Sequence, residues 1–227
     1  MAAALRSGAA SEKENDMARY SGPSCRICRR EGDALFLKGA RCFTDKCSIK
    51  RRAKIPGQHG SDRMGNKKQT GYEIQLRAKQ RVRKMYGILE RQFQKYYEIA
   101  SRKSGNTGVN LLHELETRLD NVVFRMGFGI SRAQARMWVT QGHFTVNNRS
   151  VNIPSYQLRP GDVIALRENS SLRKTIKDIM EASISRETSP WLDVDRENCK
   201  GKFVSLPERA QLDPKIQESL IIEYYSR

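Results

Sequence analysis

Four cysteines in two close pairs lie in a segment that has too few apolar residues to form a core of its own. The pairs follow the spacings Cys-x2-Cys and Cys-x4-Cys, with 13 residues between them, at Cys25, Cys28, Cys42 and Cys47. This spacing lets four thiolates reach one tetrahedral ion, as in zinc ribbons and knuckles. A bound ion would supply folding free energy that the sparse apolar residues at 35–37 cannot. We therefore expect one structural Zn²⁺ to order residues 19–60.

Other interpretations of the cysteines stay open at this point: reduced thiols without a ligand, a redox disulfide or an iron–sulfur cluster. A catalytic zinc ion needs an open coordination position, which four thiolate ligands do not leave. The many Lys and Arg residues nearby are expected to lower the thiol pKa values and so to favour thiolate ligands. Cys199, the fifth cysteine, is expected to be an ordinary semi-buried thiol.

Length and apolar content limit the size of any core, and the number of cysteines indicates the cellular compartment. The chain has 227 residues, of which 38% are hydrophobic, enough for one or two modest cores. Its longest uninterrupted apolar run covers residues 1–5, far short of the roughly 20 residues that a membrane span requires. With an odd number of cysteines and no export signal, we expect reduced thiols in a cytosol-like compartment.

Positive charge is concentrated near the start of the chain. The formal net charge is +17, and residues 19–84 alone contain 19 Lys or Arg against five Asp or Glu, a net of +14. Turn residues interrupt the basic run at 49–60, so no helix can spread these charges over one exposed face. Such a field attracts polyanions, most commonly phosphate backbones. Acidic membrane surfaces, acidic proteins and a merely solvated basic face are the alternatives.

Helical periodicity dominates the first two thirds of the chain. Residues 1–16 are small or acidic and lack periodicity, which predicts a disordered tail. The spacing of apolar residues predicts a basic helix over 71–85, a second through 89–100 and one continuous helix through 112–126. Glycines at 105 and 108 indicate a loop between the last two.

The pattern changes from helix to strand after residue 142. Before that point, Ser131 is expected to cap a helix over 131–141 and to form a capping box with Gln134. A hairpin should follow, turning at residues 147–149, because Asn tolerates positive φ. Later segments predict two further strands and one helix, at 163–166, 202–206 and 172–182. The predicted fold class is α+β, with helices first and a small antiparallel sheet later.

Several separate motifs occur in one order along the chain. Residues 118–127, 131–136 and 142–147 resemble the helix-helix-hairpin RNA-binding module of the uS4 family, small-subunit ribosomal protein four in bacteria. Further segments resemble that family in order, namely 18–23, 56–60, 80–87, 90–93, 154–156, 206–209 and 222–227. The resemblance covers residues 17–227, and the four paired cysteines resemble the zinc-containing form of the family.

The resemblance implies a two-domain architecture. A helical N-terminal domain of residues 17–112, containing the zinc-ordered segment, would be completed by about residues 206–227. The RNA-binding domain, residues 113–205, would be inserted between them, with its helix-helix-hairpin module at about 117–170 and a small antiparallel sheet.

The resemblance also implies a function and partners. The protein would be a structural constituent of the small ribosomal subunit that binds the 5′ domain of the small-subunit ribosomal RNA, nucleates assembly and contributes to translational accuracy. Expected partners are small-subunit proteins five and three, and messenger RNA where it enters the subunit, with no membrane. The location would be cytoplasmic and ribosome-bound, on a bacterial or organellar ribosome.

Folded RNA is recognised through shape, phosphate and 2′-OH contacts, which require rigidly held donors. The N-terminal turn of the helix over 131–141 offers N–H groups and a favourable dipole to phosphate, with Arg132 and Arg136 on one face. At least half of the basic residues between 19 and 54 should also touch RNA. The predicted RNA-binding residues are Arg19, Tyr20, Arg26, Arg29, Arg30, Arg41, Lys50, Arg51, Arg52, Lys54, His59, Arg77, Lys79, Arg83, Arg118, Ser131, Arg132, Gln134, Arg136, His143, Asn147 and Arg149.

Parts of the sequence are also compatible with two other functions. An accessory role in RNA modification is one, because similar modules are appended to RNA-modifying enzymes, but the sequence has no G-x-G-x-x-G, P-loop or G-x-S-x-G motif. A zinc-dependent nucleic-acid-binding regulator is the other, but neither a heptad dimerisation helix nor a finger repeat follows the cysteines. We therefore predict no enzymatic activity and no catalytic residues.

Overall fold

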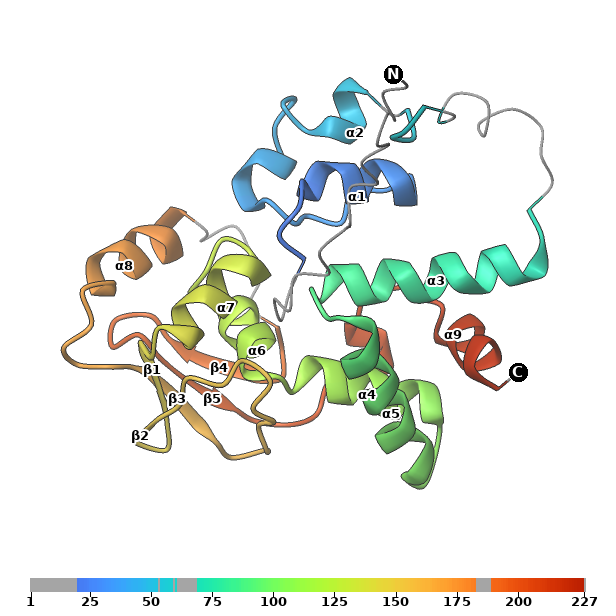
Figure 1. The fold of residues 1–227 in the computed structure, drawn as a ribbon. Coiled ribbons are helices and arrows are strands. Elements are labelled where there is room, and N and C mark those ends of the chain that lie inside the picture. The colour runs from blue at the N-terminus through green and yellow to red at the C-terminus, as the bar shows by residue number, and fades with distance from the viewer. Residues whose placement is uncertain (1–19, 53, 59, 61–68, 183–188, 227) are drawn as a thin grey trace, which may run out of the picture.

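The computed structural model describes residues 20–52, 54–58, 60, 69–182 and 189–226. Two predicted RNA-binding residues, Arg19 and His59, and the predicted tail lie outside this part of the chain. Helices come first and a five-stranded antiparallel sheet comes later, so the α+β class is confirmed (Figure 1). None of the described helices is long and apolar enough to cross a membrane.

The cysteine segment forms a small helical unit above the long helix α3 (Figure 1). It contains α1 (Ser24–Glu31), the 3-10 helix η1 (Gly39–Cys42) and α2 (Ser48–Arg51). Gly39 has φ +61°, and a Cβ there would lie 2.6 Å from the backbone oxygen of Ile130. Because the two backbones approach this closely, η1 is seated against the loop between α6 and α7, which are described below.

Two of the predicted helices are confirmed as α3 (Gly71–Met85) and α4 (Glu90–Arg102). The hydroxyl of Thr70 caps α3 by accepting the N–H of Glu73 at 3.2 Å. One face of α4 buries its apolar residues in the core, as the periodicity predicted.

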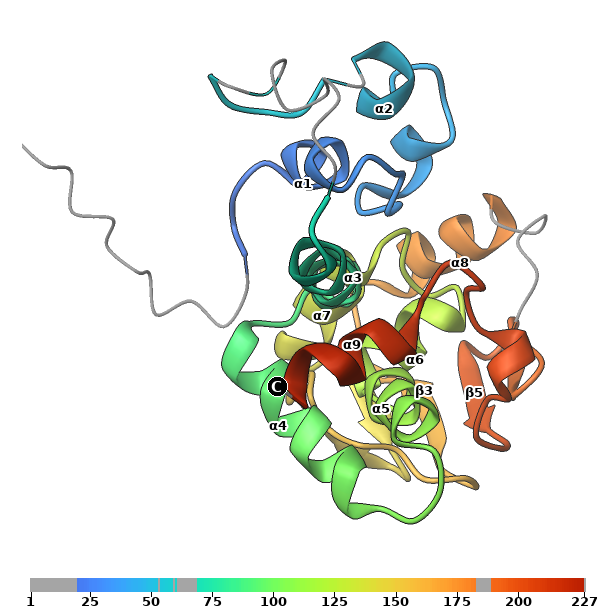
Figure 2. The ribbon, with the colours of Figure 1, turned by 90° about the vertical axis from the view of Figure 1, so that its right-hand side faces the viewer.

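The end of the chain returns to these N-terminal helices (Figure 2). After the 3-10 helix η3 (Arg209–Gln211), α9 (Glu218–Tyr225) packs against α3 and α5. The Tyr225 ring stacks on Tyr97 with centroids 4.6 Å apart, and its hydroxyl donates to Glu90 at 2.8 Å.

The prediction of one continuous helix through 112–126 is wrong. The structure has two helices, α5 (Thr107–Glu116) and α6 (Leu119–Arg125), and Arg118 between them is extended, with ψ 137°. The loop before α5 is shorter than predicted, because α4 continues to Arg102.

Contacts with a distant loop cause this break. The N–H of Leu119 donates to the carbonyl of Tyr156 at 2.9 Å, and the N–H of Leu158 donates to the carbonyl of Thr117 at 2.9 Å. A strand-like bridge to a neighbouring segment thus replaces helical hydrogen bonds at this point. Apolar periodicity cannot reveal such a tertiary contact, because the buried residues keep helical spacing on both sides of the break.

The helix predicted over 131–141 is α7 (Arg132–Thr140), and its apolar face is buried as expected. Ser131 caps it, since its hydroxyl accepts the N–H of Gln134 at 3.3 Å. The second half of the predicted capping box is wrong. The Gln134 side chain accepts the N–H of Ile130 at 2.9 Å. A capping box would require it to accept the N–H of Ser131, one residue further along the chain.

The sheet has the strand order β2-β1-β3-β5-β4, with every pair antiparallel. Its strands are β1 (Phe144–Val146), β2 (Arg149–Ser150), β3 (Val163–Leu166), β4 (Leu192–Asp195) and β5 (Lys200–Phe203). The predicted hairpin is confirmed, with φ of 48° and 63° at Asn147 and Asn148. The strand predicted at 202–206 instead ends at Phe203. The predicted helix at 172–182 is α8 (Arg173–Ala182).

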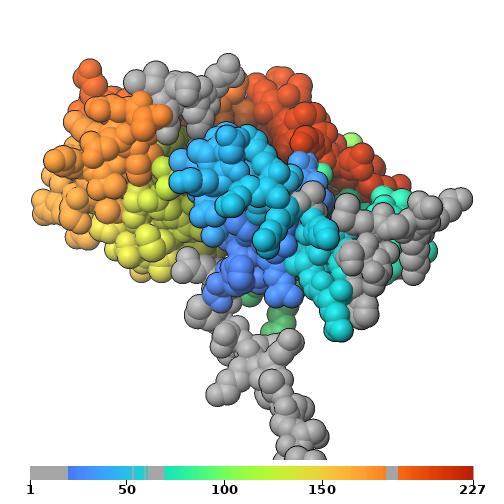
Figure 3. Space-filling view, turned by 90° about the horizontal axis from the view of Figure 1, so that it is seen from above, coloured from blue at the N-terminus to red at the C-terminus, as the bar shows by residue number. Residues whose placement is uncertain are grey.

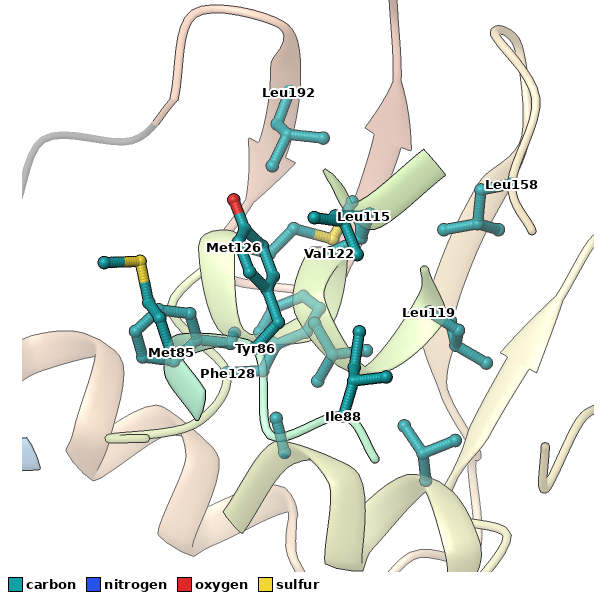
Figure 4. Packing of buried hydrophobic residues seen from close by; sticks show 14 of the residues in the cluster. Met85, Tyr86, Ile88, Leu115, Leu119, Val122, Met126, Phe128, Leu158 and Leu192 are labelled. Atoms are coloured by element: carbon teal, nitrogen blue, oxygen red, sulfur yellow. The ribbon is translucent and has the colours of Figure 1, made fainter. Parts of the chain in front are cut away.

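One apolar core joins the N-terminal helices to the sheet. Met85, Tyr86 and Ile88, at and just after the end of α3, belong to one buried cluster with residues of α5 and α6 such as Leu115 and Val122 (Figure 4). Leu192 of β4 belongs to the same buried cluster. Cys199 is fully buried rather than semi-buried. The domain boundaries predicted from the resemblance stay predictions.

Candidate nucleic-acid interface

All four paired cysteines line one small cavity between α1, η1 and the start of α2. The Cys42 thiol accepts the backbone N–H of Lys38 at 3.4 Å, and the backbone N–H of Leu35 lies against the Cys28 thiol. The described side chains contain no group of three or more His, Cys, Asp or Glu residues placed to hold a metal ion. The fold nevertheless gathers the four cysteines around one cavity.

The thiol pKa values differ from the expectation. Burial raises the pKa of Cys28 and of Cys42, and the neighbouring thiols raise both further. The backbone N–H groups of Leu35 and Lys38 work in the opposite direction. The charge of Lys38 does lower the pKa of Cys42, as expected, but burial and the mutual proximity of the thiols outweigh such effects, so the pKa values of Cys28 and Cys42 are raised.

Predicted RNA-binding side chains of the first segment lie mainly on its outer surface, which is blue to cyan in Figure 3. The exposed ones are Tyr20, Arg26, Arg41, Lys50, Arg51, Arg52 and Lys54. Arg29 and Arg30, in the last turn of α1, are half-buried. Lys50 has one acidic neighbour, Asp45, at 3.3 Å, and both side chains are more than half exposed. This surface therefore presents several cations to solvent over a short stretch of chain.

The arginines of α7 point partly into the protein. Arg132 donates to the Asn121 side chain at 2.8 Å and lies over the Tyr86 ring, 4.8 Å from its centroid. Arg136 donates to Asp120 at 3.1 Å. Both side chains are half-buried, so they can offer only part of their guanidinium groups to an RNA. The same holds for Gln134, which is half-buried and closes the cap.

Residues around the hairpin are also held by local bonds. The Asn147 side chain donates to Asp162 at 2.9 Å and accepts the N–H of Val163 at 3.0 Å. A ring nitrogen of His143 lies 3.0 Å from the Ser170 hydroxyl. Arg149 is exposed at the start of β2. Within the hairpin, Arg149 is thus the predicted residue whose side chain is most open to a partner.

Three predicted RNA-binding residues are buried. Arg118 is 2% exposed, and it donates to Asp120 at 2.7 Å and to the Tyr96 hydroxyl at 2.6 Å. Lys79 is 4% exposed and donates to Glu90 at 2.6 Å. Internal acidic partners take up these two cations, so Arg118 and Lys79 offer little of their side chains to an RNA, and contact there stays a prediction. Ser131, the third, serves as the α7 cap.

Arg77 and Arg83 of α3 also have internal partners. Arg77 lies 3.3 Å from Glu31 of α1, and Arg83 lies 3.5 Å from Glu90 of α4. Both are half-buried, so α3 uses much of its basic charge to hold neighbouring elements.

Sequence reasoning missed a buried polar network centred on Glu116. This carboxylate is fully buried and accepts hydrogen bonds from the Tyr86 hydroxyl, Asn121 and Arg125, at 2.6 Å each. Arg125 holds the pKa of Glu116 down at about 2, against the opposing effect of burial. An acidic residue directly after the apolar Leu115 was the one sequence signal, and it cannot identify Tyr86, 30 residues away.

Comparison with known proteins divides the chain at this network. Residues 19–116 match the family described as the ribosomal protein S4/S9 N-terminal domain, and residues 117–164 match the S4 domain. Small ribosomal subunit protein uS4 of Ruminiclostridium cellulolyticum is 56% identical over 211 residues, which is 93% of this chain and 100% of that protein. The uS4 protein of Desulforamulus reducens is 54% identical, and protein uS4A of Symbiobacterium thermophilum 56%, over the same shares.

Proposed function

The chain belongs to the uS4 family of small ribosomal subunit proteins, and on that premise we propose that it binds the 5′ domain of the small-subunit ribosomal RNA and nucleates subunit assembly there. As a ribosomal protein with an rRNA-binding S4 domain, it is a structural constituent of the subunit and not an enzyme. We also propose that it contributes to translational accuracy. Its proposed location is cytoplasmic and ribosome-bound, on a bacterial or organellar ribosome.

The observation that carries the proposal is the exposed basic surface of residues 20–54. Its cations lie on short helices and turns, where they can follow the irregular phosphate path of a folded RNA. Charge alone would give sequence-independent binding, so specificity needs a rigid frame. The core that joins this segment to the S4 domain supplies that frame.

One structural Zn²⁺ is proposed in the cavity lined by the four cysteines. The donor set fits, because four thiolates are the ligands of structural zinc. Helix α1 brings Cys25 and Cys28 to the cavity, while Cys42 ends η1 and Cys47 is the N-cap residue of α2. Bound Zn²⁺ would replace the mutual repulsion of the thiolates with attraction to a common cation. The cysteines of this chain would then hold α1, η1 and α2 together in the absence of a large apolar core.

Protein and messenger partners are also proposed. The uS4 relatives are small-subunit proteins, and the family resemblance implies neighbouring small-subunit proteins five and three, as well as messenger RNA where it enters the subunit. Exposed Arg and Lys on the first segment are suited to such RNA contacts, since cations bind phosphate without base specificity.

Affinity measured across a salt series tests the proposal. The purified chain is titrated with a fragment of the 5′ domain of small-subunit ribosomal RNA and with a structured RNA of equal length and unrelated sequence. We expect preference for the ribosomal fragment that persists at high salt, because shape-specific contacts do not depend on counterion release. Equal affinity for the two RNAs with one steep salt slope would contradict the proposal.

A further inference from the structure

Two aromatic rings on the first segment are stacked on each other and exposed to solvent. The Phe36 and Phe43 centroids are 5.0 Å apart with an interplanar angle of 24°. Phe36 is 46% exposed and Phe43 is 69% exposed, the largest exposed fraction among the exposed large apolar residues of the described chain. Neither ring belongs to the buried core. The pair is therefore an apolar platform in the most basic part of the chain.

The backbone at Phe36 makes this placement costly to the fold. Its φ is +50°, in the left-handed region, where a bulky side chain is an outlier. Gly or Asn would adopt this conformation with less strain. Since the Phe36 ring is also half in solvent, packing within the protein does not account for an aromatic residue at this position. Strain combined with exposure points to a contact outside the chain.

The platform forms one wall of a groove of about 670 Å³. Other walls come from the end of α3 at Met85, from α6 at Phe124, and from α8 at Ile179. In Figure 3 the surfaces of the first segment and of α8, coloured orange, lie side by side around this region. Gly39 of η1 abuts Ile130, so the wall that bears the two rings is fixed against the α6–α7 loop. A groove of this size is large enough for a nucleobase with its ribose.

Charge around the groove favours a nucleotide as the occupant. Lys38 and Arg41 are exposed, line the neighbouring cysteine cavity, and each lies two residues from one of the rings along the chain. Arg125 and Arg132 line the groove itself. Asp178 and Asp213 line other parts of it and would repel phosphate. A base can stack on the rings while its phosphates lie toward Lys38 and Arg41. In that orientation the phosphates are attracted to the cations and stay away from Asp178 and Asp213. Stacking on exposed aromatics beside cations is how proteins hold unpaired RNA bases.

We propose that Phe36 and Phe43 form a stacking platform for one unpaired base of the small-subunit ribosomal RNA. This inference rests on the proposed function, because it assigns a binding site to the same RNA. The alternative occupant is an apolar segment of a neighbouring protein, which would also fit the groove but would not need an aromatic ring.

Substitution at Phe43 tests the proposal in the full-length chain with the 5′ domain RNA fragment. We expect Phe43→Ala to weaken binding roughly 5- to 150-fold, the effect of losing one base–aromatic stack, with an unchanged salt slope. Phe43→Tyr should retain the affinity, and Phe43→Leu should lose it as Ala does, because Leu is apolar but has no π face. The matched control is Val204→Ala, which truncates a side chain that is 50% exposed at a position remote in sequence.

A second measurement covers the case in which a variant misfolds. Ultraviolet irradiation of the wild-type complex should crosslink RNA to the peptide that contains Phe36 or Phe43, as identified by mass spectrometry. The proposed stacking platform would be refuted if Phe43→Ala or Phe43→Leu bound the RNA fragment with wild-type affinity. It would also be refuted if the crosslinks omitted this peptide. Either result would leave the proposed RNA-binding function intact. Failure of the wild-type chain to prefer the ribosomal fragment would instead refute the proposed function.

Discussion

Replacing Glu116 with Gln removes the negative charge at the centre of the buried network. Glu116 ends α5, and its partners Tyr86, Asn121 and Arg125 come from the end of α3 and from α6. The network therefore joins the N-terminal helices to the S4 domain. Gln has nearly the same shape, so the substitution tests charge and hydrogen bonding rather than volume.

The expected loss can be worked from the pKa of Glu116. A folded-state pKa of about 2, against an ordinary value of 4.5, corresponds to roughly 3 kcal/mol of preference for the charged form at neutral pH. Breaking a buried ion pair by removing one partner costs about 3–5 kcal/mol, because the remaining charge is left without compensation. The remaining charge here is that of Arg125. We expect Glu116→Gln to lower the free energy of unfolding by about 3 kcal/mol.

Urea denaturation at several pH values measures this loss. The pKa of Glu116 is depressed in the folded state, so its stabilising effect is present above the unfolded value of 4.5 and disappears as pH falls toward 2. The difference between wild type and variant should therefore be full at pH 7 and shrink steadily below about pH 5. Glu98→Gln, on the exposed face of α4, is the control and should change stability by less than about 0.5 kcal/mol. A Glu116→Gln variant as stable as this control at pH 7 would refute the reasoning.

Three further predictions concern the cysteines and the basic residues. Replacing Cys25 and Cys28 with Ser should remove hydrogen-exchange protection from residues 20–60 and spare 113–170; unchanged protection in both segments would count against the zinc proposal. Arg41→Gln should weaken RNA binding and lower the salt slope of log affinity by about 1, as expected for one lost phosphate contact, whereas an unchanged slope would remove Arg41 from the interface. Arg118→Gln should lower the free energy of unfolding by about 3 kcal/mol in urea without changing that slope, since buried Asp120 would lose its bidentate partner and keep only Arg136; a reduced slope in a stable variant would restore Arg118 as an RNA contact.

Local patterns were sufficient to predict most elements of the fold. The helix at 71–85 and the strand at 163–166 have the predicted bounds, and the Asn147–Asn148 turn has the predicted positive φ. Each of these features depends on residues close together in sequence, such as the Thr70 cap or the alternation along a strand.

Tertiary contacts account for the errors. The break before α6 arises where Arg118 is bridged to Gln157, 39 positions along the chain, and apolar spacing gives no sign of that bridge. The same limit applies to the candidate site. Charge composition identified the basic first segment, but an arginine on the surface and one paired to a buried carboxylate look alike in sequence. Arg41 and Arg118 are such a pair, one exposed and the other 2% exposed.

A hydroxyl-radical footprint of the full-length chain on intact small-subunit ribosomal RNA tests the central claim most directly. The account predicts protected nucleotides that cluster around one helix junction of the 5′ domain and stay protected as salt is raised, since rigid shape-specific contacts outlast the electrostatic ones. Protections scattered over the RNA and lost at moderate salt, or a cluster in another domain, would contradict it.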